Sequence, residues 1–277
     1  MPPLTHEEIR LAFAGRYSDL VPLTPSGQGS VFSATLSAPS GGVDTVALKI
    51  YNVGTLEERT DREIAAMRRL SSPCLVRLIG SGTQIVRGSD CIWIETEFIE
   101  GRSIATELQD GPLSELRTAA IIRDVAIAIE ALWDERIVHR DIKPANVMLT
   151  GSGRAVVIDL GLARHVDLSS VTGIGATCGT LGYLSPEQAR ANHALTCKSD
   201  IFALGILAEE CLLGRHPTGN QQSYLLTGGP KVATLGLRPS PILETVVDSM
   251  IQTDAFRRPN PAQVVSEMRK LIGGATP

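Results

Sequence analysis

The stretch VHRDIKPANVMLT, residues 138–150, decides the fold because it places ionisable and amide side chains in one short loop between two apolar runs. Asp141 can act as a base toward a hydroxyl group, and Lys143 can lie beside a transferred anionic group. Asn146 carries a neutral oxygen that suits a hard cation such as Mg²⁺. The loop therefore holds the side chains needed to orient a hydroxyl group and to bind a cation.

Three further charged residues complete this set. Asp159, in AVVIDLGLAR, follows an apolar run and precedes a glycine that lets the backbone turn sharply, so its carboxylate can bind the same cation. Lys49 lies in the strand-like VALKI, where its ammonium group can reach phosphate oxygens, and Glu63 on the next helical stretch is placed to pair with it. Such cation ligands, a phosphate-facing lysine and a hydroxyl-orienting aspartate are what phosphoryl transfer requires. The pattern predicts a loop that holds a hydroxyl group beside a metal-bound nucleotide.

The composition is that of a globular enzyme and excludes several classes of partner. Of 277 residues, 43% are hydrophobic and 20% are charged, and the formal net charge is -4. Neither nucleic acid nor membrane is therefore expected as a partner. The five cysteines follow no disulfide or zinc-site spacing, and the N-terminus shows no secretory signal, which together predict a cytoplasmic protein. The longest apolar stretch, residues 201–213, is interrupted by Glu209 and Glu210 and predicts a buried helix rather than a membrane span.

The first part of the chain reads as mostly strands. Residues 29–51 predict two strands with a turn at 38–42, and the runs 74–82 and 91–99 predict two more. Two helices are expected in the same part. One begins at a capping box formed by Thr5 and Glu8, and the other spans residues 56–70, where apolar residues recur with helical spacing.

The second part reads as mostly helical. Residues 114–134 predict a long amphipathic helix, and short strands are expected near 147–149 and 155–159. We therefore expect one domain, residues 1–277, of class α+β, with a small lobe at about 1–98 and a larger lobe at about 103–277. The connection is expected at about 97–102, and a cleft between two lobes is a natural place for a ligand.

The sequence resembles eukaryotic-type (Hanks-type) protein kinases, and most of all the bacterial Ser/Thr members, from about Leu20 to Leu271. The motifs that carry the resemblance appear in the family's order. They are VALK with Lys49, then Glu63, HRDIKPAN with Asp141, Lys143 and Asn146, DLG with Asp159, GTLGYLSPE, SDIFALG with Asp200 and Gly205, and FRRP with Arg258. The resemblance implies the bilobal protein-kinase fold, with a β-rich small lobe that holds one main helix and a helical larger lobe.

The resemblance also implies roles for these residues, with ATP and Mg²⁺ or Mn²⁺ as cofactors. Lys49 would contact the α- and β-phosphates and pair with Glu63, and Asp141 would be the catalytic base with Lys143 beside it. Asn146 and Asp159 would hold the metal ion. In the larger lobe, the activation-segment residue Glu187 would pair with Arg258 and stabilise the lobe.

The nucleotide pocket implied by the resemblance departs from the family at its glycine-rich loop. Thr24 and Ser26 stand where the family has the first two glycines, while Gly29 matches the third and Gly27 is an extra glycine. The remaining residues expected to contact the nucleotide come from three strand-like runs. They are Val31, Ala47, the gatekeeper Thr96, and Glu97 and Phe98, whose backbone would bind adenine.

The substrate class follows from Lys143 and Thr180, which match the Ser/Thr enzymes of the family. Arg140 precedes Asp141, an arrangement that in this family goes with activation by phosphorylation. Thr172 and Thr177 are the candidate phosphorylation sites, with Thr172 favoured, and a phosphate there would pair with Arg140. The alternative interpretation is a polar loop without modification.

Three functions compete. The favoured one is an ATP-dependent protein Ser/Thr kinase that autophosphorylates its activation segment and acts on a protein substrate. A pseudokinase that binds nucleotide or a partner without catalysis is the alternative, supported only by the unusual glycine-rich loop. A small-molecule phosphotransferase of similar fold is the third, and it would lack the pair of Glu187 with Arg258. A homodimer is left open.

Overall fold

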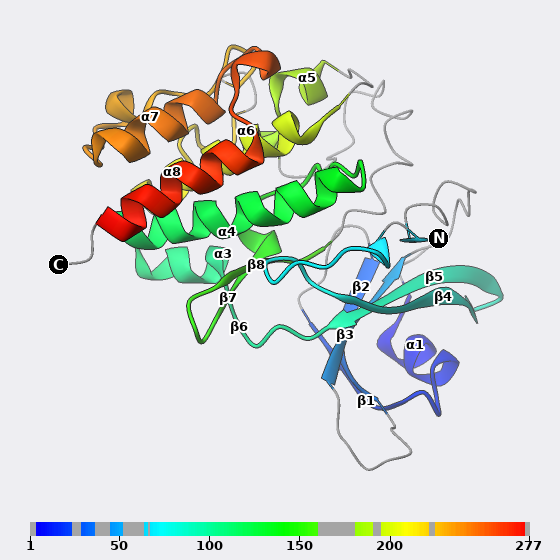
Figure 1. Cartoon of the computed structure of the whole chain (residues 1–277). Coiled ribbons are helices and arrows are strands. Elements are labelled where there is room, and N and C mark those ends of the chain that lie inside the picture. Colours follow the sequence, from blue (N-terminus) through cyan, green and yellow to red (C-terminus); the bar gives the residue numbers. More distant parts are fainter. Residues whose placement is uncertain are drawn as a thin grey trace. The chain divides into compact units, whose positions relative to one another are not determined.

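The computed structural model describes residues 4–23, 29–36, 45–51, 64–65, 67–159, 181–190, 195–221 and 225–274. The chain forms two compact units (Figure 1). The first contains residues up to Arg69 together with Val76–Ile99, and the second contains Leu70–Leu75 together with residues from Glu100 onward. Each unit has its own cluster of buried hydrophobic side chains.

The first unit is built on an antiparallel five-stranded sheet. Its strands are β1 (Tyr17–Pro22), β2 (Gly29–Leu36), β3 (Thr45–Tyr51), β4 (Leu78–Val86) and β5 (Ser89–Glu97), in the order β1-β2-β3-β5-β4. The strands predicted within residues 29–51 and from residue 91 are confirmed. The β-branched and aromatic residues of these strands favour the sheet because they fit a pleated surface that is buried on one face.

Helix α1 (His6–Ala12) covers that face. Thr5 begins the helix with the predicted capping box, since its hydroxyl accepts from the Glu8 amide and the Glu8 carboxylate accepts from the Thr5 amide. Ile9 and Phe13 are buried in one cluster with Leu48 and Trp93 of the sheet. The amphipathic helix thus joins residues near the start of the chain to β3 and β5.

The second unit combines a small sheet with helices. The sheet contains β6 (Gly101–Ser103), β7 (Val147–Thr150) and β8 (Ala155–Val157), paired antiparallel in that order. The helices are α3 (Ile104–Glu107), α4 (Glu115–Asp134), α5 (Pro186–Ala189), α6 (Cys197–Leu213), α7 (Pro241–Met250) and α8 (Pro261–Gly274). Short 3₁₀ helices lie at Leu108–Asp110, Pro144–Asn146, Leu181–Tyr183, Val232–Leu235 and Ala255–Arg257.

Helices α4 and α6 form the centre of this unit. Ser114 caps α4 as the predicted helix requires, and α8 lies along α4 (Figure 1). Helix α6 is buried on nearly every side, from Cys197 to Cys211, which is expected for a helix that is apolar all round. The buried helix predicted at residues 201–213 is therefore confirmed, and its left-handed C-cap at Gly214 ends it.

Three segments differ from the sequence predictions, and the first is β1, which was not predicted. The strand predicted at 74–82 begins only at Leu78, because Leu75 instead forms a bridge with Val157 and the Cys74 carbonyl accepts from the Val157 amide. Residues 70–75 consequently belong to the second unit. Strand β6 was not predicted. It needs Gly101, since any side chain there would collide with the Leu149 carbonyl oxygen.

Most of the helix predicted at 56–70 lies outside the described residues, and helical backbone is seen at residues 64, 65 and 67.

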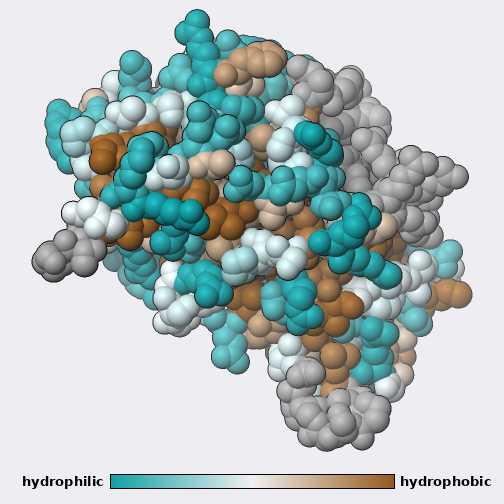
Figure 2. Space-filling model, viewed as in Figure 1, coloured by the Kyte–Doolittle hydropathy of each residue, from teal (hydrophilic) through white to brown (hydrophobic). Residues whose placement is uncertain are grey.

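On the face shown in Figure 2, hydrophilic side chains are interspersed with smaller hydrophobic areas. Among the described helices, none combines the length and the apolar character that a membrane crossing needs.

Candidate active site

The loop after α4 brings three of the predicted residues together, with Lys143 and Asn146 on the Asp141 carboxylate. Asp141 is 9% exposed, and its Oδ2 accepts from Lys143 Nζ at 2.9 Å and from Asn146 Nδ2 at 3.0 Å. The same Asn146 nitrogen donates to the Asp141 backbone carbonyl at 2.9 Å. Two donors on one oxygen orient the carboxylate, and a charge-assisted contact is the stronger kind of hydrogen bond. The amide oxygen of Asn146 is then the atom with which this side chain can bind a cation.

Asp200 of α6 fixes the backbone of this loop. Its two oxygens accept from the amides of His139 and Arg140, each at 2.8 Å. Asp200 is 1% exposed, and this burial raises its pKa above the ordinary value although His139 and the two amides favour the charged form. Arg140 has a left-handed backbone, with φ of 67°. The two hydrogen bonds hold this uncommon conformation directly before Asp141.

Asp159 lies beside Asn146 because the two flank the same end of a strand pair. Val147 pairs with Val157 in the β7–β8 ladder, and the Ile158 amide donates to the Asn146 carbonyl at 2.9 Å. The ladder therefore continues to the residue before Asp159. His139 joins this arrangement, since its Nδ1 accepts from the Asp141 amide at 3.3 Å and its Nε2 donates to the Ile158 carbonyl at 3.4 Å.

These two residues fit a hard divalent cation by the chemistry of their donors. An amide oxygen and a carboxylate are oxygen ligands of the type that Mg²⁺ and Mn²⁺ prefer. Asp159 also has a left-handed backbone, with φ of 62°, which is an uncommon conformation for a non-glycine residue. Strained backbone of this kind concentrates at functional sites.

In the first unit, the strand register puts the candidate nucleotide contacts on one face of the sheet. Val31 lies opposite Lys49, and Ala47 lies opposite Thr96. Side chains of residues directly opposite each other, or two apart on one strand, point to the same face of a sheet. Ala47 and Lys49 are two apart on β3, so all four side chains lie on one face. The other face is the one that α1 covers. The candidate nucleotide contacts therefore occupy the face that α1 leaves uncovered.

The end of β5 is fixed by Arg77. The Glu97 amide donates to the Arg77 carbonyl at 3.0 Å, and the Arg77 amide donates to the Glu97 carboxylate at 2.9 Å.

The remaining nucleotide candidates lie as follows. Lys49 Nζ lies 4.9 Å from the centre of the Tyr51 ring. Gly29 is the first residue of β2, opposite Tyr51, and Phe98 directly follows β5. The candidates Gly27, Glu63, Thr172, Thr177 and Thr180 lie outside the described residues.

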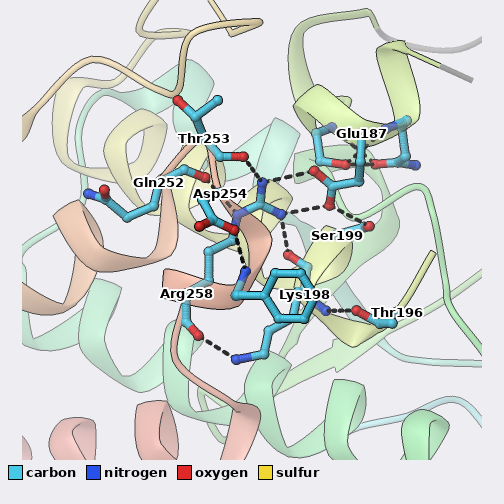
Figure 3. A network of polar contacts seen from close by, with 11 residues as sticks. Glu187, Thr196, Lys198, Ser199, Gln252, Thr253, Asp254 and Arg258 are labelled. Carbon is cyan, nitrogen blue, oxygen red and sulfur yellow. Dashed lines mark hydrogen bonds and ion pairs between the residues drawn. The ribbon is translucent and has the colours of Figure 1, made fainter. Parts of the chain in front are cut away.

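The predicted pair of Glu187 and Arg258 is present (Figure 3). Arg258 Nη1 and Nη2 donate to the two Glu187 oxygens at 2.7 and 2.9 Å, and Ser199 Oγ donates to Oε1 at 2.7 Å. Burial opposes ionisation of Glu187, but the Arg258 guanidinium and the Ser199 hydroxyl outweigh it and hold its pKa below the ordinary value. The Arg258 side chain is fully buried, and three further contacts reach the backbone carbonyls of Gln252, Lys198 and Thr253.

A connection that the sequence did not reveal joins α5 to the catalytic loop. Ser185 caps α5 in a capping box with Gln188, and Gln188 Nε2 donates to the Arg140 carbonyl at 3.4 Å. The spacing S-x-x-Q before a helix is a signal from which the capping box could have been predicted. The contact with Arg140 has no such local signal because the two residues are 48 positions apart.

The comparisons with known proteins agree with this geometry. The sequence matches the protein kinase domain family over residues 24–268. Serine/threonine-protein kinase pkn2 of Myxococcus xanthus is 31% identical over 276 residues, which cover 93% of this chain and 32% of that protein. A probable serine/threonine-protein kinase PknB of Corynebacterium glutamicum is 30% identical over 94% of this chain and 42% of that protein. The chain thus spans about a third to two fifths of the length of these relatives.

Proposed function

Because this chain belongs to the protein kinase domain family, we propose that it is a serine/threonine protein kinase that transfers the γ-phosphoryl group of ATP to hydroxyl groups of a protein substrate. The observation that carries the proposal is the Asp141 carboxylate, held by Lys143 and Asn146 on one oxygen. The relatives named above are bacterial, which supports a bacterial origin. The cytoplasm is the place of action in this proposal.

Asp141 would orient the acceptor hydroxyl and accept its proton as the new phosphate ester forms. The proton acceptor needs a defined direction, and the two donors on Oδ2 provide it. Lys143 has a second role, since its ammonium group lies within 2.9 Å of Asp141 and so beside the place where the anionic group passes. Its positive charge would stabilise the negative charge that develops there.

Asn146 and Asp159 would bind the metal ion through their side-chain oxygens. A bound Mg²⁺ or Mn²⁺ ion supplies positive charge to the phosphate oxygens of ATP. The Ile158 amide and the Asn146 carbonyl keep the two residues in register. Lys49, with Glu63 as its partner, would contact the α- and β-phosphates, and Gly27, Gly29, Val31, Ala47, Thr96, Glu97 and Phe98 would surround the nucleotide. Thr172 and Thr177 would be the sites of autophosphorylation.

The test is phosphate transfer from labelled ATP to a generic protein acceptor in the presence of Mg²⁺ or Mn²⁺. We expect label on Ser and Thr of the acceptor and of this chain, with sites in residues 165–180 identified by mass spectrometry. Asp141→Asn should abolish transfer and keep ATP binding, since the amide cannot accept the proton.

The matched control is Asp110→Asn, which changes an exposed carboxylate that pairs with Arg102 at 2.8 Å. This variant should transfer phosphate at the rate of the unaltered protein. If the unaltered protein binds ATP and transfers no phosphate to any acceptor, the pseudokinase alternative replaces the proposal. Unchanged turnover in Asp141→Asn would contradict the role of Asp141.

A further inference from the structure

His216 is a buried imidazole whose two nitrogens are both engaged. It is 7% exposed and lies just after the C-cap of α6. Its Nδ1 accepts from the amides of Thr218 at 3.2 Å and Asn220 at 3.0 Å. An amide N–H can only donate, so Nδ1 carries no proton. The proton is therefore on Nε2, which donates to the Gly182 carbonyl at 3.1 Å.

Gly182 fits closely against this imidazole. A Cβ atom at Gly182 would lie 2.5 Å from His216 Nε2 and 2.7 Å from Asn220 Oδ1. Real Cβ atoms do not approach other heavy atoms so closely, so the site accepts glycine only. The backbone at Gly182 is thus held both by a hydrogen bond and by direct packing.

The next residue, Tyr183, is held from the same side. Its ring meets the His216 ring edge to face, with centres 5.0 Å apart, and its hydroxyl donates to the Glu210 carboxylate. The 3₁₀ helix Leu181–Tyr183 is therefore attached to the end of α6 through both residues. We call the contacts of His216 with Gly182, Tyr183, Thr218 and Asn220 the His216 latch.

The latched segment is directly connected to the catalytic loop. Ser185 begins α5, and Gln188 of α5 donates to the carbonyl of Arg140, the residue before Asp141. Gln188 thus ties this segment to the backbone directly before Asp141, so an acceptor hydroxyl at Asp141 would lie near it. A change in the position of this backbone changes the surface that the acceptor meets.

We propose that His216 is a positioning residue for the protein acceptor, because it fixes the Leu181–Tyr183 backbone beside the catalytic loop through the Gly182 carbonyl. This inference rests on the proposed kinase function. His216 touches neither nucleotide nor acceptor, so it acts through Gly182 and Tyr183. Loss of the latch should weaken use of the protein acceptor and leave the Michaelis constant for ATP unchanged.

The latch also requires a neutral imidazole. A proton added at Nδ1 would face two amide donors and break both contacts. Burial lowers the pKa of His216 below 6.5, so the latch is complete at neutral pH and opens on acidification below that value. The described titratable groups that face it are Tyr183 and, through the Tyr183 hydroxyl, Glu210. Burial raises the pKa of both, so Tyr183 stays protonated throughout this range.

The test separates the two imidazole nitrogens by substitution. His216→Gln keeps an amide nitrogen near the position of Nε2, whereas His216→Asn keeps an oxygen near the position of Nδ1 and cannot donate to Gly182. With myelin basic protein as acceptor, His216→Asn should raise its Michaelis constant about fivefold, the size expected for one buried hydrogen bond. His216→Gln should restore most of this loss, and neither variant should change the Michaelis constant for ATP.

The pH profile and a matched histidine serve as controls. The acceptor constant of the unaltered protein should rise below pH 6.5, and this rise should be absent in His216→Asn. His6→Asn removes a comparable hydrogen bond, from His6 Nε2 to the Leu20 carbonyl at 2.9 Å, in the first unit. It should leave the acceptor constant unchanged. An equal increase in His6→Asn and His216→Asn, or an increase shared by ATP, would overturn the proposal.

Two measurements without catalysis test the latch independently of the proposed function. Nitrogen chemical shifts of labelled histidine should show the proton of His216 on Nε2, and hydrogen exchange in residues 181–190 should be faster in His216→Asn. A proton on Nδ1, or unchanged exchange, overturns the latch. Absence of phosphate transfer by the unaltered protein overturns the proposed function and leaves these two results to decide the latch.

Discussion

Replacing Glu209 with Gln should stabilise the second unit, and the gain should grow with pH. Glu209 lies on α6 and is 0% exposed, and neither carboxylate oxygen has a hydrogen-bond partner among the residues that the structure describes. Burial, with a smaller contribution from the charge of Asp248, raises its pKa to about 9. The folded protein therefore holds a neutral carboxyl group at pH 7.

The size of the effect follows from the two protonation states. In the unfolded chain, Glu209 ionises with its ordinary pKa of 4.5, so folding at pH 7 must add a proton. A difference of one pH unit corresponds to about 1.4 kcal/mol, so the 2.5 units between 4.5 and 7 cost about 3 kcal/mol. Because the folded pKa is the higher one, the cost is absent below pH 4.5 and grows until about pH 9. Gln carries no charge in either state and removes it.

The assay is urea or thermal unfolding of the unaltered protein and Glu209→Gln between pH 5.5 and 8. The difference in unfolding free energy should increase by about 3 kcal/mol over this range. At pH 7 we expect the unfolding temperature to rise by roughly 6 °C. Glu267→Gln is the matched control, since Glu267 is exposed and pairs with Lys270 on α8. It should change stability by less than about 0.5 kcal/mol at every pH.

A constant difference between Glu209→Gln and the unaltered protein across this pH range would refute the reasoning. It would mean that Glu209 is ionised in the folded state. A loss of stability in Glu209→Gln at pH 8 would refute it as well, because the amide would then lack a contact that the carboxyl group makes.

Three further predictions concern the ion pairs and the metal ligands. Arg16→Ala should destabilise the first unit by about 1.5 kcal/mol in urea unfolding, because it removes a 2.7 Å contact from Glu95, which is 1% exposed and keeps the Tyr17 hydroxyl as a donor. Arg258→Lys should cost about 2 kcal/mol, since a lysine cannot make the two parallel contacts with Glu187, whereas Arg257→Lys on the surface should be neutral. Asp159→Asn should raise the Mg²⁺ concentration for half-maximal phosphate transfer at least tenfold, and an unchanged Mg²⁺ titration would contradict its role as a ligand.

Local patterns in the sequence were sufficient for most of the helices and strands. The capping box of Thr5 and Glu8, the long helix after Ser114 and the strand pair of residues 29–51 were all predicted because their signals lie within a few residues. The family was also visible in the sequence, since its motifs appear in order with their chemistry intact. The match to the protein kinase domain family confirms the predicted fold class.

Burial of individual charges could not be predicted in this way. Glu209 and Glu210 looked alike in the sequence, as two interruptions of an apolar run. In the structure, Glu209 is fully buried and has no hydrogen-bond partner among the described residues, while Glu210 accepts from Tyr183. Helix α6 is apolar on nearly every side, so its own periodicity does not show which of the two glutamates is buried. The helices packed around α6 decide that.

The sequence by itself therefore determined the fold class, the candidate residues of the catalytic loop and the pairing of Glu187 with Arg258. Only the tertiary structure decided that residues 70–75 join the second unit, that Asp200 fixes the backbone before Asp141, and that His216 holds Gly182. The physical reason is separation along the chain. The partners in these contacts lie 34 to 60 or more residues apart, and each side chain finds its partner only when the helices and strands between them have packed.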